Sequence, residues 1–196
     1  MARPRPSTGA DIALIAVFAA LIAVFSLTPI PAAVIGVPIT LQTLAVALTG
    51  LVLGAWRGFL ATLLYVVVGL AGLPVLAGGG AGIGVLAGYT AGYLLSFPLA
   101  AALTGAIAGY GLRRSRRFHF LWLAGAAVAG AVLVTTPMGI AGLVLNAGMT
   151  LPAATVAALS FVPLDIVKMF VAAGIALAVH KAFPAILETR AAVASQ

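Results

Sequence analysis

The stretch IALIAVFAALIAVFSL, residues 12–27, carries no charged side chain and opens a run of 45 uncharged residues between Asp11 and Arg57. Two further uncharged runs follow, of 55 and 47 residues, and the last one ends at Asp165. A helix needs roughly 20 residues to cross the hydrocarbon core of a bilayer, so each run is long enough for about two crossings. Of the 196 residues, 64% are hydrophobic and 7% are charged, and the mean hydropathy is +1.26. The sequence therefore predicts an integral membrane protein.

Prolines and glycines divide the uncharged runs into six predicted transmembrane helices. These residues favour turns over helix interiors, and they cluster at positions such as 29–38 and 72–74. The fold class is predicted to be an all-α membrane bundle in a single domain, residues 1–196, with a hairpin before the last helix. The first apolar stretch would also suit a secretory signal, but a bacterial multi-span chain needs no cleavable leader. The predicted helices lie at about 11–28, 39–54, 57–72, 90–112, 119–145 and 163–180.

The basic residues predict an orientation in the membrane. In a six-helix chain, both termini and the loops after helices two and four lie on one face, and nine of the ten Lys and Arg residues fall there. By the positive-inside rule this face is cytoplasmic, and the uncharged loops at 28–38, 73–89 and 146–162 lie outside. The nine residues are Arg3, Arg5, Arg57, Arg113, Arg114, Arg116, Arg117, Lys181 and Arg190.

Several classes of function are disfavoured by what the sequence lacks. It has no cysteine and so no disulfide or thiolate metal site, and its two histidines, His119 and His180, are expected at the membrane interface rather than around a metal. No glycine loop is followed by Lys and Ser or Thr, so the chain is not expected to bind ATP itself. We expect no enzymatic activity, no cofactor and no nucleic-acid partner. The arginine cluster at 113–117 is interpreted as a topogenic loop, with binding to anionic lipid or to a partner as the alternative.

A glycine-rich stretch, GLAGLPVLAGGGAGIGVLAGYTAG at residues 69–92, contains nine glycines in 24 positions. Irregular backbone near membrane depth requires protein or a water-filled cavity to satisfy its amides. We therefore expect this loop, between helices three and four, to fold back as a cap over a binding site. A disordered exterior loop is the alternative, and the apolar residues within the stretch argue against it.

An aspartate and a lysine interrupt the last apolar segment, FVPLDIVKMF at residues 161–170. Asp165 alone is explained by the dipole of a helix that starts near Pro163, but Lys168 gains nothing from that dipole. Three residues apart, the two side chains lie on one face, where each offsets the desolvation of the other. Ionisable residues in membrane segments usually mark a substrate or ion path. Acceptor oxygens beside an ammonium group suit a solute with both N–H groups and carbonyl or carboxylate oxygens, and a purely structural ion pair is the alternative.

Three stretches resemble the BioY family, the biotin-binding S components of energy-coupling-factor transporters. They are GVPITLQTLAVALTG (36–50), GLPVLAGGGAGIGVLAGYTAGYLLSFPLAAALTG (72–105) and FVPLDIVKMFVAA (161–173), and the resemblance extends over residues 10–182. Its most specific elements are P-I-T-L-Q-T, the G-L-P-V loop and P-x-D-x-x-K. The chain departs from the family pattern at Tyr89 and Leu164. Some relatives also place an asparagine or arginine in the glycine-rich region, and this chain has neither there.

The resemblance implies a six-helix subunit that binds biotin from outside with high affinity. Its partners are a transmembrane T component and two cytoplasmic ATPases, which alone bind ATP. The substrate-binding residues that it implies are Asp165, Lys168, Gln42, Thr43, Gly79, Thr90 and Tyr93.

The first helix carries two overlapping A-x-x-x-A spacings, Ala16 with Ala20 and Ala19 with Ala23. Small residues at this spacing let another helix approach closely, either inside the bundle or in a partner. The resemblance favours the T component as that partner. Two other functions remain open at this stage: a secondary transporter driven by protonation of Asp165, and a membrane scaffold that carries no solute. A secondary transporter would be expected to show a second ionisable site or an inverted repeat.

Overall fold

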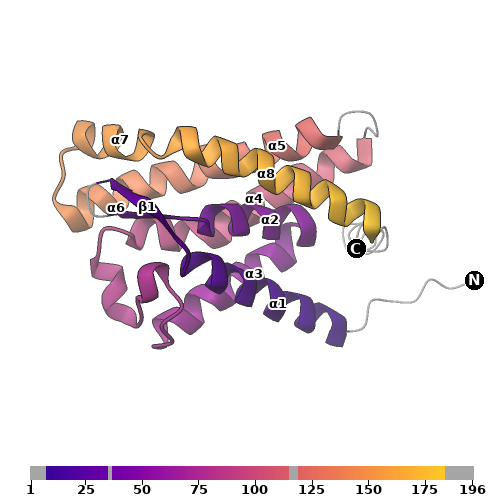
Figure 1. Ribbon diagram of the computed structural model, residues 1–196, viewed down its shortest axis with the longest axis horizontal. Coiled ribbons are helices and arrows are strands. Elements are labelled where there is room, and N and C mark those ends of the chain that lie inside the picture. The colour runs from indigo at the N-terminus through magenta and orange to yellow at the C-terminus, as the bar shows by residue number, and fades with distance from the viewer. Residues whose placement is uncertain (1–7, 35–36, 115–118, 184–196) are drawn as a thin grey trace, which may run out of the picture.

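The computed structural model describes residues 8–34, 37–114 and 119–183, which form a bundle of helices along one long axis (Figure 1). The first half contains α1 (Thr8–Ser26), β1 (Pro29–Val34), β2 (Val37–Thr40), α2 (Gln42–Leu53) and α3 (Ala55–Leu70). The short helices η1 (Ala77–Gly79) and η2 (Ile83–Ala87) lead to α4 (Ala91–Arg114). The second half contains α5 (His119–Gly130), η3 (Ala131–Thr135), α6 (Thr136–Ala147), α7 (Leu151–Leu159) and α8 (Val162–Ala182).

Four helical stretches of the described chain are long and apolar enough to cross a membrane: α1, α4, the continuous unit α5–η3–α6 and α8. The prediction of a helical membrane protein is confirmed at this level. The remaining two predicted spans are shorter, with 12 residues in α2 and 16 in α3. At about 1.5 Å per residue they measure about 18 and 24 Å, less than the roughly 30 Å of the hydrocarbon core.

The helix predicted at 39–54 begins only at Gln42, because the residues before it form an antiparallel hairpin. Val34 pairs with Val37 and Pro29 with Thr40, with an irregular register after Pro29. An outer loop was predicted at 28–38 because its prolines and glycine favour turns. Proline also cannot donate a ladder hydrogen bond, which usually keeps it out of strands. In a two-stranded hairpin both strands are edge strands, and each uses only one side for pairing. A proline whose missing N–H would point to the unpaired side therefore removes no hydrogen bond between the strands.

Two further departures from the predicted helices occur in the second half of the chain. The helix predicted at 119–145 contains the π-helical turn η3, which ends just before Pro137. Proline lacks an N–H group and its ring clashes with the carbonyl four residues earlier, which accounts for the wider turn. The outer loop predicted at 146–162 contains α7, a nine-residue helix with Pro152 in its first turn.

The core of the bundle is α2, whose residues are buried at 11 of 12 positions. It packs against α3, α4, α8 and, less extensively, α1. A helix that is apolar on all sides belongs in a protein interior, and α2 fits this description. By contrast, α1 buries only Ala19, Ile22 and Ser26, so it lies at the periphery of the bundle.

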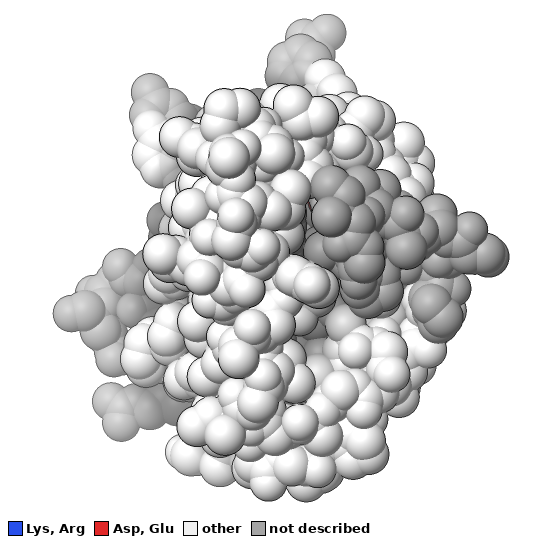
Figure 2. Space-filling model, turned by 90° about the vertical axis from the view of Figure 1, so that its left-hand side faces the viewer, with Lys and Arg blue, Asp and Glu red and all other residues white. Residues whose placement is uncertain are grey.

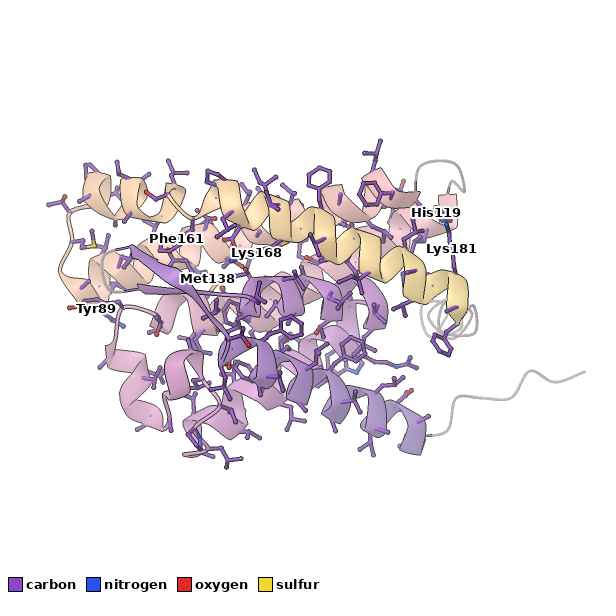
Figure 3. All side chains as sticks on the ribbon, viewed as in Figure 1. Tyr89, His119, Met138, Phe161, Lys168 and Lys181 are labelled. Carbon is purple, nitrogen blue, oxygen red and sulfur yellow. The ribbon has the colours of Figure 1, made fainter. Side chains whose placement is uncertain are left out.

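The two ends of the bundle differ in charge. The helix α1 begins and α8 ends at one end, while the hairpin and the α6–α7 connection lie at the other (Figure 1). Figure 2 looks onto this second end and shows no charged side chain among its described residues. His119 and Lys181 lie at the first end (Figure 3), where Arg57 also pairs with Asp11 at 2.8 Å. Five of the predicted basic residues lie outside the described residues: Arg3, Arg5, Arg116, Arg117 and Arg190.

Glycines allow α4 to cross the corner between α2 and α3. Gly54 forms this corner with a φ of 86°, which an L side chain rarely adopts. Opposite it, a Cβ atom on Gly105 of α4 would collide with the backbone of Gly54 and Ala55. The corner that positions α2 in the core therefore requires glycine on both sides of the contact.

Gly105→Ala is expected to lower the free energy of unfolding by about 1–3 kcal/mol or more, because backbone atoms cannot move aside easily. Gly109→Ala, on the same helix, is the matched control, because a Cβ atom added there would meet no atom within 4 Å. Thermal unfolding of both variants in one detergent provides the measurement. Equal midpoints for the two variants would contradict this account of the α4 crossing.

Candidate functional site

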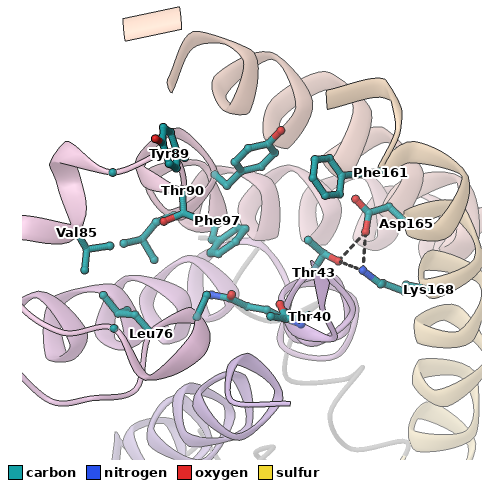
Figure 4. A pocket seen from close by; sticks show the side chains of 16 residues that line it. Thr40, Thr43, Leu76, Val85, Tyr89, Thr90, Phe97, Phe161, Asp165 and Lys168 are labelled. Carbon is teal, nitrogen blue, oxygen red and sulfur yellow. Dashed lines mark hydrogen bonds and ion pairs between the residues drawn. The ribbon is translucent and has the colours of Figure 1, made fainter. Parts of the chain in front are cut away.

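A cavity of about 330 Å³ lies between the end of β2, the segment before α4, and the first turns of α2, α4 and α8 (Figure 4). Its volume is near the lower end of the roughly 300–1,000 Å³ that is usual for small-molecule sites. Its lining is mostly apolar with a few polar side chains. The lining residues are Thr40, Gln42, Thr43, Leu76, Ala77, Gly80, Val85, Gly88, Tyr89, Thr90, Tyr93, Leu94, Phe97, Phe161, Asp165 and Lys168.

The ion pair on α8 contributes the charged part of the wall. Asp165 lies in the first turn, and its backbone N–H bonds to the carbonyl of Phe161 at 2.9 Å. Lys168 follows one turn later on the same face, and its Nζ atom lies 3.0 Å from Oδ1 of Asp165. Lys168 is only 5% exposed, while the side chain of Asp165 keeps 20% of its surface open. The carboxylate is therefore the more accessible member of the pair.

Thr43 on α2 completes a triangle of hydrogen bonds with this pair. Its hydroxyl donates to Oδ1 of Asp165 at 2.9 Å and accepts from Nζ of Lys168 at 3.3 Å (Figure 4). Within the described chain, the ammonium group thus has two partners and can donate a third bond. The three bonds of the triangle leave the second carboxylate oxygen of Asp165, Oδ2, as a further acceptor. The packing of α2 against α8 therefore positions both an acceptor and a donor for a solute.

Gln42, next to Thr43, is held by two hydrogen bonds. Its backbone N–H bonds to Oγ1 of Thr40 at 3.2 Å, and its Nε2 donates to the hydroxyl of Tyr65 at 2.8 Å. Because the amide nitrogen is engaged by α3, the amide oxygen of Gln42 remains as an acceptor. Gln42 is 4% exposed, so its orientation is determined by the protein interior rather than by solvent.

Another part of the wall is aromatic and aliphatic. Phe97 and Leu94 are buried on α4, and Tyr93 meets Phe161 edge-on with ring centroids 6.2 Å apart. Edge-to-face packing of this kind restricts both rings. The hydroxyl of Tyr93 is buried and has no hydrogen-bond partner among the described residues. An apolar ring system thus has a rigid surface to lie against, beside the ion pair (Figure 4).

Six of the seven predicted substrate-binding residues line this one cavity: Asp165, Lys168, Gln42, Thr43, Thr90 and Tyr93. Gly79 does not. It is exposed, with a φ of 81°, and its neighbours Ala77 and Gly80 form the lining instead. A turn reverses the direction of the chain here, so adjacent glycines face different sides.

Several residues of the site were not predicted from the sequence. Thr40 belongs to the P-I-T-L-Q-T element and could have been inferred from it, because it precedes the first turn of α2. Tyr65 and Phe161 carry no local signal, since only the three-dimensional packing brings them to Gln42 and Tyr93.

The predicted alanine pairs of α1 separate in the structure. Ala16 and Ala20 are exposed on the outer surface of the bundle. Ala19 is 7% exposed and Ala23 is half-buried, and both pack in the cluster that α1 shares with α2, α3 and α4. Ala19 and Ala23 therefore serve packing within the chain, and only the Ala16–Ala20 pair is open to another helix.

These features together define a class of protein. A helical membrane bundle whose apolar cavity contains a shielded ion pair is typical of proteins that bind a small, partly polar solute. The chain belongs to the BioY family, whose model matches residues 2–185. The family membership predicted from the sequence is thereby confirmed.

Relatives of this chain cover nearly its whole length. A protein of Rhodobacter capsulatus named as biotin transporter BioY is 41% identical over 190 residues, which cover 92% of this chain and 98% of the relative. A protein of the same name from Rhizobium etli is 38% identical over 182 residues, 89% of this chain and 95% of the relative. Because the named members are transport proteins, the expectation that this chain is no enzyme is confirmed.

The fold also matches a solved structure, the crystal structure of the S-component for biotin from an ECF-type ABC transporter. The TM-score is 0.82, with 24% sequence identity, and the match covers 92% of this chain and 95% of the other. At this identity the likeness shows the fold, which this chain shares with that S-component.

Proposed function

We propose that this chain is the biotin-binding S component of an energy-coupling-factor transporter in a bacterial cytoplasmic membrane. The observation that carries the proposal is the shielded triangle of Asp165, Lys168 and Thr43 in the wall of a vitamin-sized cavity. The 41% identity to a named biotin transporter over nearly the full length supports biotin as the solute.

The chemistry of biotin suits this cavity. Its ureido ring has two N–H donors and one carbonyl acceptor, its fused rings are apolar, and a short aliphatic chain ends in a carboxylate. Asp165 accepts hydrogen bonds from N–H groups, and Lys168 donates to an oxygen. The rings then lie against Phe97 and Phe161, which supply the apolar contact area.

Six membrane crossings follow from this proposal, although α2 is short. The strand β2 continues α2 toward the uncharged end (Figure 1), and four strand residues add about 13 Å to the 18 Å of the helix, or about 31 Å in all. The uncharged end then faces outside, where the segment at 71–90 covers the cavity as a cap. Both termini face the cytoplasm, in keeping with the positive-inside rule.

Transport also requires partners, because no P-loop is present in this sequence. We propose that a transmembrane T component docks on the Ala16–Ala20 face of α1 and links it to two cytoplasmic ATPases. The support is the exposure of both alanines on a peripheral helix. One turn apart, they leave a groove into which another helix fits closely.

The ligand assignment is tested by substitutions in the ion pair. Asp165→Asn and Lys168→Ala are each expected to weaken biotin binding by at least about tenfold, or about 1.4 kcal/mol. Calorimetric titration of the purified protein measures this, with one site per chain expected. Thr155→Ala is the control, because the Thr155 hydroxyl is exposed and bonds only within α7, to Leu151. Biotin binding at wild-type affinity in both variants would refute the assignment.

The partner face is tested by Ala16→Leu combined with Ala20→Leu. The added bulk should block co-purification of the T component and ATPases while biotin affinity stays within about twofold of wild type, since overpacking acts at the contact where it occurs. Ala141→Leu, at an exposed position of α6, is the control. If folded yield and biotin affinity fall together, the face packs inside the protein. An intact complex with the double variant would also overturn this assignment.

A further inference from the structure

The outer loop, residues 71–90, is attached to the bundle firmly in its first half. The Ser26 hydroxyl of α1 donates to the carbonyl of Val75, and the backbone N–H of Gly82 bonds to the carbonyl of Gly69 at 2.8 Å. Leu76 is 1% exposed, and its side chain packs so closely on Gly69 that a Cβ atom at residue 69 would collide with it. This half is therefore tied to α1 and α3 by both hydrogen bonds and a buried apolar side chain.

The second half, residues 83–89, is attached differently, and we call it the gate segment. None of the residues of η2 within it is buried. Its backbone bonds are local turns, such as Val85 N–H to Gly82 at 3.2 Å and Gly88 N–H to Val85 at 3.1 Å. In the described chain, its side-chain hydrogen bonds from another element all come from Asn146 of α6, whose Nδ2 donates to Leu86 at 2.8 Å and Gly88 at 3.1 Å.

The gate segment is also a wall of the cavity. Val85, Gly88 and Tyr89 line it from this side (Figure 4), and Tyr89 is 50% exposed. This part of the cavity wall is therefore attached to other elements through the two Asn146 hydrogen bonds and through the apolar packing of Val85. Gly82, at its start, has a φ of 77°, where glycine can rotate without the steric cost that other residues meet.

We infer that the gate segment opens to admit and release the solute, and that Asn146 is the positioning residue that holds it closed. Asn146 lies in the last turn of α6 and does not line the cavity, so it acts on the loop and not on the ligand. Only the identity of the solute in this inference rests on the proposed function.

This role has a kinetic signature. Hydrogen bonds that hold the segment closed do so with the cavity empty or filled, so they reduce the open population in both states. Opening of the gate segment then limits both the association and the dissociation of the solute. Because the equilibrium between open and closed states scales both rate constants equally, it cancels from their ratio, and Kd stays unchanged. A residue that contacts the ligand would instead change mainly the dissociation rate.

Asn146→Ala removes both hydrogen bonds, and Asn146→Asp replaces the donor with an acceptor at the same size. Stopped-flow measurement with biotin should show both rate constants raised by about threefold to tenfold, with Kd changed by less than about twofold. Ser160→Ala is the control, because its exposed hydroxyl, just after α7, bonds in the described chain to the carbonyl of Val156 and not to the gate segment. Unchanged rates overturn the inference, and so does a faster dissociation rate with unchanged association.

Hydrogen exchange on the ligand-free protein tests the same inference without reference to biotin. Asn146→Ala should speed amide exchange at residues 83–89 by about threefold to tenfold and leave residues 72–82 unchanged. Uniform exchange rates in variant and wild type would overturn the role of Asn146. A wild-type protein that shows no biotin binding would refute the proposed function, while the exchange result still decides whether Asn146 holds the gate segment.

Discussion

The pairing of Asp165 with Lys168 is the interaction on which the rest of the site depends. An isolated charge removed from water costs several kcal/mol, so neither side chain would be stable at this depth alone. Their spacing on α8 joins them directly, and Thr43 adds a hydroxyl from α2 that bonds to both. The pair has no net charge, yet the carboxylate can still accept a hydrogen bond and the ammonium group can still donate one. In the proposed function, this combination is what lets an apolar cavity recognise a polar solute.

The three proposed tasks fall on separate surfaces of the bundle. The proposed solute site lies where α2, α4 and α8 begin, and the hairpin leads directly into α2 at this point. The exposed Ala16–Ala20 face lies on peripheral α1, away from the cavity lining. The gate segment lies at the uncharged end, between Asn146 and the cavity. A change at one surface can therefore be tested without altering the atoms of the other two.

Features determined by local chemistry were predictable from the sequence. Long uncharged runs indicated membrane helices, and two charges within one of them indicated the centre of the site. The hairpin was missed because its prolines argue against strands in general, and only its two-edged geometry tolerates them. Gly79, which the resemblance implied, does not line the cavity, and a loop pattern does not tell which way each residue of a turn faces. The bonds from Gln42 to Tyr65 and from Asn146 to the gate segment join residues 23 and about 60 positions apart, and no local pattern encodes them.

The most direct test of the central claim is an experimental structure of the purified protein with biotin bound. The account predicts the ureido ring at hydrogen-bond distance, about 2.7–3.2 Å, from the carboxylate of Asp165 and the ammonium group of Lys168, with the fused rings against Phe97 and Phe161. Biotin bound outside this cavity, or inside it with the ureido ring turned away from the ion pair, would contradict the account.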